Sequence, residues 1–142
     1  MLVQTAAQER NWAMAAHLSA LVAIAGIPFG HVLGPLVVYL IKGHESEFIG
    51  EHARASLNFQ ITLTLLTIVG VIVAVAATFG FIVPLSLADS TGVTFNLAAL
   101  WIAFGVACLV VLVASVLFII LGALAASEGR TYTYPFAIRF LR

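Results

Sequence analysis

The side chains able to do chemistry in this chain gather in the stretch Phe48–Gln60 and just beyond it. At helical spacing Glu51, Arg54 and Asn58 share one face of a helix, because residues three or four apart are neighbours on its surface. A carboxylate, a guanidinium and a carboxamide then enter an otherwise apolar segment, where they must face protein or water rather than lipid. With its neighbours, this polar stripe comprises Glu51, His52, Arg54, Asn58, Gln60 and Thr62.

Two interpretations of the polar stripe are open. In the structural one, Glu51 and Arg54 form an ion pair, while Asn58 and Gln60 bond to loose backbone groups where a preceding hairpin is broken. In the functional one, the stripe lines a path or binding site for a solute, because polar residues inside membrane segments often mark such pathways. The residue types are compatible with both.

The four histidines raise the question of a metal or proton site. His44 and His52 stand among glutamates, but a glycine-containing loop separates them, so no two-histidine helical face results. We therefore predict a solvated acidic loop, with no metal and no cofactor. His17 lies in an apolar segment, where it either bonds to a neighbouring helix or serves a proton or ligand. No sequence pattern of an enzyme nucleophile, phosphate loop or redox pair is present, so the chain is predicted to be non-enzymatic.

Composition places the chain among integral membrane proteins. Hydrophobic residues make up 63% of its 142 residues and charged residues 8%, against about a quarter charged in soluble domains. The mean hydropathy is +1.15. A formal net charge of zero argues against nucleic acid as a partner. The single cysteine, Cys108, is expected to be a small core residue.

The elements that must position these groups are all helical. We predict one integral membrane domain over residues 1–142, an all-α polytopic bundle with a short broken hairpin and two long spans. The expected helices cover approximately residues 11–27, 33–42, 51–83 and 97–126. The tail 131–142 is expected to lie on the membrane surface, with Pro135 beginning a short helix.

The basic residues decide how residues 12–42 cross the membrane. Gly26–Pro35 holds two prolines and three glycines, which predicts a turn. With a hairpin there, every Lys and Arg lies on one side, and the opposite loop, Pro84–Asn96, has none. With one broken span instead, Arg10 alone is stranded outside. The hairpin is favoured, and it predicts a multi-pass protein of the cell membrane with both termini cytoplasmic.

Small residues recur at helical spacing in three of the predicted helices. Such stripes let helix backbones approach closely, which drives packing within a membrane. We therefore expect the partners of the chain to be the lipid bilayer and the helices of a second copy or of other membrane proteins. The stripe residues are Ala13, Ala16, Ala20 and Ala23, then Gly70 and Ala74, then Ala99, Ala103 and Ala107. Gly122 and Ala126 repeat the small-residue spacing near the inner end of the last helix.

Several motifs resemble those of a widespread bacterial family of small membrane proteins of unknown function. They are Asn11–Ser19, Ile27–Pro28, Gly34–Leu36, Phe48–Gln60 and Tyr134–Arg139. That family is distantly similar to the twenty-kilodalton subunit of the chloroplast inner-envelope protein translocon. The resemblance implies four helical segments with cytoplasmic termini, in agreement with the charge distribution, and it does not imply translocation.

Two functions remain at this level. The first is a membrane subunit or scaffold that binds helices through small-residue faces. The second is a small channel or carrier for a solute, a proton or a polypeptide. A scaffold predicts polar groups that bond to one another, whereas a conductor predicts a continuous wet path. Beyond Thr62, the long helix offers only Thr64, Thr67 and Thr78 as polar side chains, which favours the scaffold.

Overall fold

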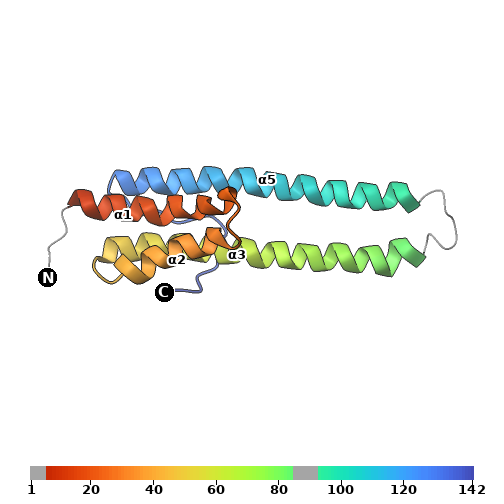
Figure 1. Ribbon diagram of the computed structural model, residues 1–142, viewed down its shortest axis with the longest axis horizontal. Coiled ribbons are helices and arrows are strands. Elements are labelled where there is room, and N and C mark those ends of the chain that lie inside the picture. The colour runs from red at the N-terminus through yellow and green to blue at the C-terminus, as the bar shows by residue number, and fades with distance from the viewer. Residues whose placement is uncertain (1–5, 85–92) are drawn as a thin grey trace. The chain divides into compact units, whose positions relative to one another are not determined.

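The computed structural model describes residues 6–84 and 93–142, and within them it is helical with no strand. This confirms the predicted all-α class, a short hairpin followed by two long helices (Figure 1). The expected outer loop falls largely on residues 85–92, outside the described residues. The elements are α1 (Ala6–Leu18), the 3-10 helix η1 (Ser19–Ala25), α2 (Gly30–Lys42), α3 (Glu47–Ala77), the π-helix η2 (Thr78–Ile82) and α5 (Val93–Ser127).

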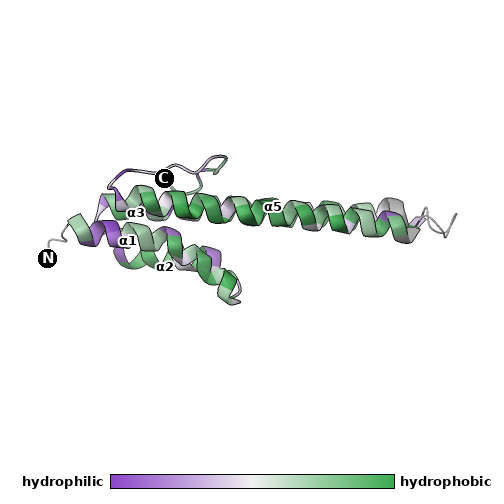
Figure 2. Cartoon of the chain, turned by 90° about the horizontal axis from the view of Figure 1, so that it is seen from above, coloured by the Kyte–Doolittle hydropathy of each residue, from purple (hydrophilic) through white to green (hydrophobic). Residues whose placement is uncertain are grey.

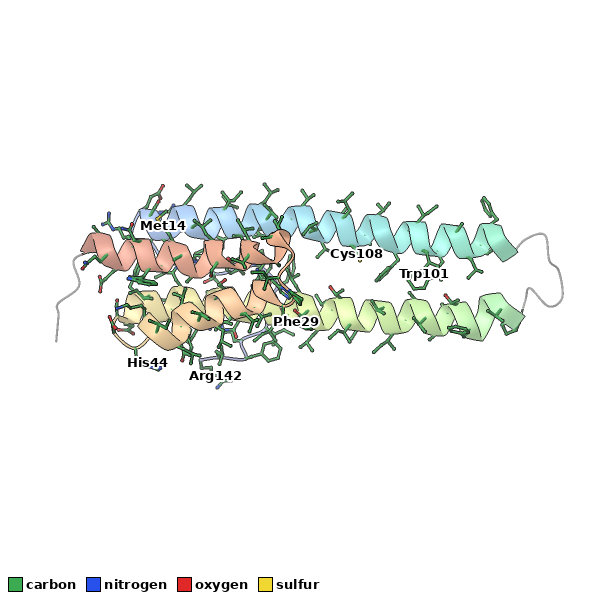
Figure 3. All side chains as sticks on the ribbon, in the orientation of Figure 1. Met14, Phe29, His44, Trp101, Cys108 and Arg142 are labelled. Carbon is green, nitrogen blue, oxygen red and sulfur yellow. The ribbon has the colours of Figure 1, made fainter. Side chains whose placement is uncertain are left out.

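The hairpin is formed by α1 and η1 on one arm and α2 on the other, and Phe29 lies at its tip (Figure 3). The chain reverses through Gly26 (φ 85°) and Phe29 (φ 57°), both left-handed. A Cβ at Gly34 would lie 2.3 Å from the Ser19 carbonyl oxygen, so only glycine allows this contact. The arms begin earlier than predicted, at residues 6 and 30 instead of 11 and 33. The second does so because the N–H of Gly30 already bonds to the carbonyl of Ile27.

The alanine stripe of the first arm faces protein. Ala13, Ala16 and Ala20 are buried, and Ala23 is half-buried. Ala16 packs with Val38 of α2 and with Ile49 and Ala53 of α3 in one apolar cluster. The small side chains of α1 thus bring three helices together around the start of α3.

Two helical stretches have the length and composition to cross a membrane. They are Glu47–Gly80 and Phe95–Ser127, with hydropathies of 2.4 and 3.1. In each helix, only 11% of the most apolar 18-residue stretch is buried. Neither helix is therefore the core helix of a soluble protein. Figure 2 shows α5 hydrophobic along its length and the start of α1 hydrophilic. At 13 residues, α2 is about 20 Å long, too short to span a hydrocarbon core of about 30 Å.

The chain divides into two compact units. The first holds residues 1–63 and 115–142, and the second holds residues 64–114. In the second unit, Gly70 meets the ring of Phe104, and Ala74 is buried, so this stripe packs inside the chain. The α5 stripe Ala99, Ala103 and Ala107 is exposed. Cys108, expected in the core, is half-buried on α5 (Figure 3).

The predicted helix at the C-terminus is wrong. Residues 137–142 have no regular secondary structure, and the local features are a turn at Pro135–Phe136 and one hydrogen bond from the N–H of Phe140 to the carbonyl of Ile138. Phe136 has a φ of 62°, a left-handed conformation in which an α-helix cannot continue. What holds this segment instead is a set of bonds to α3, described below.

Replacing Gly70 by Leu should destabilise the second unit. A Cβ at this position would already lie 3.1 Å from Phe104 Cε2, and overpacking costs about 1–3 kcal/mol. Val73→Leu is the matched control, because Val73 is 61% exposed. Circular dichroism melting in detergent should show a lower Tm for Gly70→Leu and an unchanged Tm for Val73→Leu. Equal Tm values for the two variants would show that Gly70 does not pack against Phe104.

Candidate functional site

The side chain of Asn58 binds the backbone of the C-terminal segment. Its Oδ1 accepts hydrogen bonds from the N–H groups of Phe140 (3.0 Å) and Leu141 (2.8 Å), and its Nδ2 donates to the carbonyl of Leu141 (3.0 Å). One turn on, the Thr62 hydroxyl accepts from the N–H of Ile138 (3.0 Å) and donates to the carbonyl of Asn58 (2.7 Å). We call these bonds the Asn58 clamp. They attach the extended segment along α3.

The clamp corrects one expectation and explains another. Asn58 was expected to bond to backbone at the break of the hairpin, and its bonding partners are instead residues 82 and 83 positions later. The same bonds explain the missing C-terminal helix. Buried N–H groups need acceptors, and α3 side chains supply them at Ile138, Phe140 and Leu141, so this segment needs no helix of its own.

A second buried group joins three elements through His17, His52 and Tyr134. His17 Nδ1 lies 2.8 Å from the Tyr134 hydroxyl, and His17 Nε2 lies 2.7 Å from His52 Nδ1. All three residues are buried. The Tyr134 ring stacks on Phe59, with centroids 4.2 Å apart. We call this group the His–His–Tyr chain.

A glycine on α5 makes room for the His–His–Tyr chain. A Cβ at Gly122 would lie 2.9 Å from His17 Nδ1, so any other residue would push the imidazole away from Tyr134. The close approach of α1 and α5 therefore depends on a missing side chain. It turns the predicted small-residue spacing near Gly122 into a specific requirement of the polar site.

Burial sets the protonation of this group. His17 lies outside the two helices long enough to span a membrane. Burial, reinforced by the neighbouring His52, lowers the pKa of His17 to about 3. Burial also raises the pKa of the Tyr134 phenol, with the Ser56 hydroxyl opposing this. Near neutral pH, His17 and Tyr134 are thus both uncharged, and a neutral imidazole offers one donor and one acceptor.

The His–His–Tyr chain can run in two directions. Either Tyr134 donates to His17 and His17 to His52, or each bond is reversed. At the far end of the chain, His52 also meets the backbone of Arg130. The arrangement therefore matches the structural interpretation of His17, a bond to a neighbouring helix.

The predicted ion pair between Glu51 and Arg54 does not form. Ion pairs among the described residues join Lys42 to Glu45 (2.8 Å) and Arg130 to Glu128. Glu51 is exposed. A Cβ at Gly50 would meet the Arg54 guanidinium, at 3.2 Å from Nη1, so Arg54 lies back over its own helix. Neighbours at this spacing gain only a few tenths of a kcal/mol, so the spacing alone does not require a pair.

Glu51, Arg54 and Asn58 line a pocket of about 410 Å³ between α3 and the C-terminal segment. The opposite wall includes Tyr132, Tyr134 and the basic residues Arg139 and Arg142. Of the rest of the polar stripe, His52 joins the His–His–Tyr chain, Thr62 joins the clamp, and Gln60 is buried. Within residues 6–84 and 93–142, no group of three or more His, Cys, Asp or Glu residues could hold a metal ion.

Sequence reasoning missed the role of Tyr134, which was expected at the membrane interface. No spacing rule links a tyrosine to a histidine 117 positions away. The one signal was indirect, since the motif Tyr134–Arg139 accompanied Asn11–Ser19 and Phe48–Gln60 in the family resemblance. The structure brings those three motifs together in the first unit.

Comparison with known proteins identifies the family. The model of the magnetosome magnetite crystal formation protein family matches residues 8–141, and the chain belongs to that family. No curated protein matches the chain, and no solved structure does. These comparisons give no support to a likeness with the chloroplast translocon subunit. With two long, exposed apolar helices, the chain is a membrane protein.

Asn58→Leu should release the C-terminal segment from α3. The change removes three hydrogen bonds, and each polar group left unpaired costs about 1–3 kcal/mol. Thr78→Val is the control, because the Thr78 hydroxyl bonds only to the Ala74 carbonyl of its own helix. We expect a lower Tm and faster proteolysis after residue 130 for Asn58→Leu alone. Similar digestion of both variants would show that the clamp does not hold the segment.

Stability should fall with acid because of His17. Its pKa is about 3 in the folded protein and near 6.5 when unfolded, so the unfolded chain binds more protons between these values. The Tm should therefore decrease as pH falls from 6.5 towards 4, and this group should contribute no change above 6.5. His17→Gln keeps polar atoms without titrating, so its Tm should depend less on pH. If Tm depends on pH equally in the wild type and in His17→Gln, His17 is not the cause of the loss of stability in acid.

Proposed function

We propose that this member of the magnetosome magnetite crystal formation family is a non-enzymatic, membrane-embedded scaffold subunit. It would assemble with itself, or with other membrane proteins, through small-residue faces of its helices. The family description supplies the setting, which is magnetite crystal formation. The proposal includes a multi-pass topology with both termini cytoplasmic, as the distribution of Lys and Arg predicts.

The observation that carries the proposal is that polar side chains bond to one another or to backbone groups of the same chain. The clamp and the His–His–Tyr chain account for five polar side chains of the first unit: Asn58, Thr62, His17, His52 and Tyr134. The hydroxyls of Thr62 on α3 and Thr78 at the start of η2 both donate to the carbonyl four residues earlier. A conduit needs polar atoms directed at a continuous wet path. The observed bonding favours a packed subunit instead.

The exposed face of α5 offers a surface for assembly. Ala99, Ala103 and Ala107 are four residues apart and exposed, whereas Gly70 and Ala74 already pack within the chain. An exposed stripe of small residues lets a second helix approach closely in lipid. The face is bordered by large exposed residues, including Ile102 (66%) and Val106 (55%), which suit a lipid or helix contact.

A channel or carrier is the second candidate, and the His–His–Tyr chain is the observation that favours it. A directional chain of hydrogen bonds from Tyr134 through His17 to His52 has the form of a short proton relay. Passage of a solute or of a polypeptide would belong to the same candidate. Each of these transport functions would be detected as flux across reconstituted membranes.

Ala103→Leu should weaken self-assembly without unfolding the chain. Leu would separate helices that meet at this stripe, and the position is exposed within one chain. Val106→Leu is the control on a neighbouring exposed position. Crosslinking in nanodiscs should show a smaller oligomer fraction for Ala103→Leu only, at unchanged Tm. In a magnetosome-forming bacterium lacking the gene, the control should restore magnetite crystal size and Ala103→Leu should not.

Flux measurements on the same proteins separate the two candidates. If Ala103→Leu keeps the wild-type oligomer fraction while His17→Gln abolishes proton flux in proteoliposomes, the channel replaces the scaffold. If neither the wild type nor His17→Gln conducts protons, and the oligomer fraction of Ala103→Leu is smaller than that of the wild type, the scaffold function is supported.

A further inference from the structure

Half of the basic residues of the chain surround one pocket. Of six Lys and Arg residues, Arg54, Arg139 and Arg142 line the pocket beside α3. One carboxylate, Glu51, lines it with them, so the lining has a formal net charge of +2. Lys42 and Arg130 are elsewhere and have acidic partners. The three pocket arginines have no ion pair within the part of the chain that the structure describes.

The pocket has the donors that a phosphate group needs. Guanidinium groups bind phosphate oxygens through two parallel N–H bonds, and several around one cavity reinforce each other. Tyr132 adds a hydroxyl, and burial raises the pKa of this phenol, so it remains a donor. Asn58 also lines the pocket, but the clamp occupies its amide, so Asn58 positions the wall rather than the ligand. At about 410 Å³, the cavity exceeds the size of a bare ion.

The outer side of the same segment points to a lipid as the source of the phosphate. The segment carries both basic and apolar side chains. Arg139 and Arg142 line the pocket, while Phe136, Ile138 and Phe140 do not and are 93%, 55% and 46% exposed. A segment with exposed apolar side chains beside two arginines suits the boundary between headgroups and acyl chains. Basic pockets at this depth bind anionic headgroups.

We propose that this pocket is a binding site for a phosphate group, supplied by the headgroup of an anionic phospholipid. Arg54 binds the phosphate from α3, and Arg139 and Arg142 bind it from the C-terminal segment (Arg142 is labelled in Figure 3). The bound lipid joins the segment to α3 in addition to the Asn58 clamp. The site is independent of the proposed scaffold function, because it depends only on the first unit.

The test compares lipids and pocket variants in the full chain. Purified protein in detergent is titrated with short-chain phosphatidylglycerol, short-chain phosphatidylcholine or inorganic phosphate, and Tm and native mass spectra are recorded. We expect phosphatidylglycerol to raise Tm and remain bound, phosphatidylcholine to bind at least tenfold more weakly, and phosphate alone to have little effect. The double variant Arg54→Gln with Arg139→Gln should lose at least tenfold in affinity.

Two further variants make the result specific. Arg10→Gln removes the same charge outside the pocket and should bind as the wild type does. Arg54→Lys keeps the charge without the paired donors, so it should lose part of the affinity while folding normally. Equal losses for Arg10→Gln and the double variant, or equal binding of both lipids, would overturn the site. Stabilisation by inorganic phosphate at the same concentration would retain a phosphate site but reject the lipid as its source.

Discussion

The first unit depends on one side chain on α3 that binds backbone more than 80 residues away. Asn58 makes three hydrogen bonds to the extended C-terminal segment, and Thr62 adds a fourth. A segment without helix or strand must find partners for its N–H and C=O groups elsewhere. Here an amide supplies both an acceptor and a donor from one position, which fixes the register of the segment against α3.

The register of the C-terminal segment against α3 determines where the other functional groups lie. Tyr134, a few residues earlier, reaches His17 and stacks on Phe59. His17 in turn reaches His52, so α1, α3 and the C-terminal segment meet at one buried polar group. The residues that follow carry Arg139 to the pocket and Phe140 to the surface. A buried polar chain and a basic pocket are thus two results of the same attachment.

The sequence predicted what local patterns determine. Hydropathy and helical spacing identified the two long helices, and the glycines and prolines of Gly26–Pro35 identified the hairpin turn. The errors lay where tertiary contacts outweigh local preference. A short helix was predicted to begin at Pro135, but backbone bonds to α3 replace it. Glu51 and Arg54 fit the ion-pair spacing, but the Arg54 guanidinium lies over Gly50 of its own helix instead.

Contacts between distant residues left no trace in any local pattern. The partner of Asn58 is 83 positions away and the partner of His17 is 117 positions away. The polar stripe was therefore correctly singled out as unusual, while its bonding could not be derived. Gly122 shows the same limit, since its spacing suggested helix packing and its actual role is to admit the imidazole of His17.

Hydrogen exchange at single amides of the C-terminal segment tests the account most directly. The N–H groups of Ile138, Phe140 and Leu141 are bonded to Thr62 and Asn58, while the structure shows no hydrogen bond for those of Ala137 and Arg139. In nanodiscs, nuclear magnetic resonance should find slow exchange at 138, 140 and 141 and fast exchange at 137 and 139. Uniformly fast exchange across the segment would contradict an attachment through Asn58.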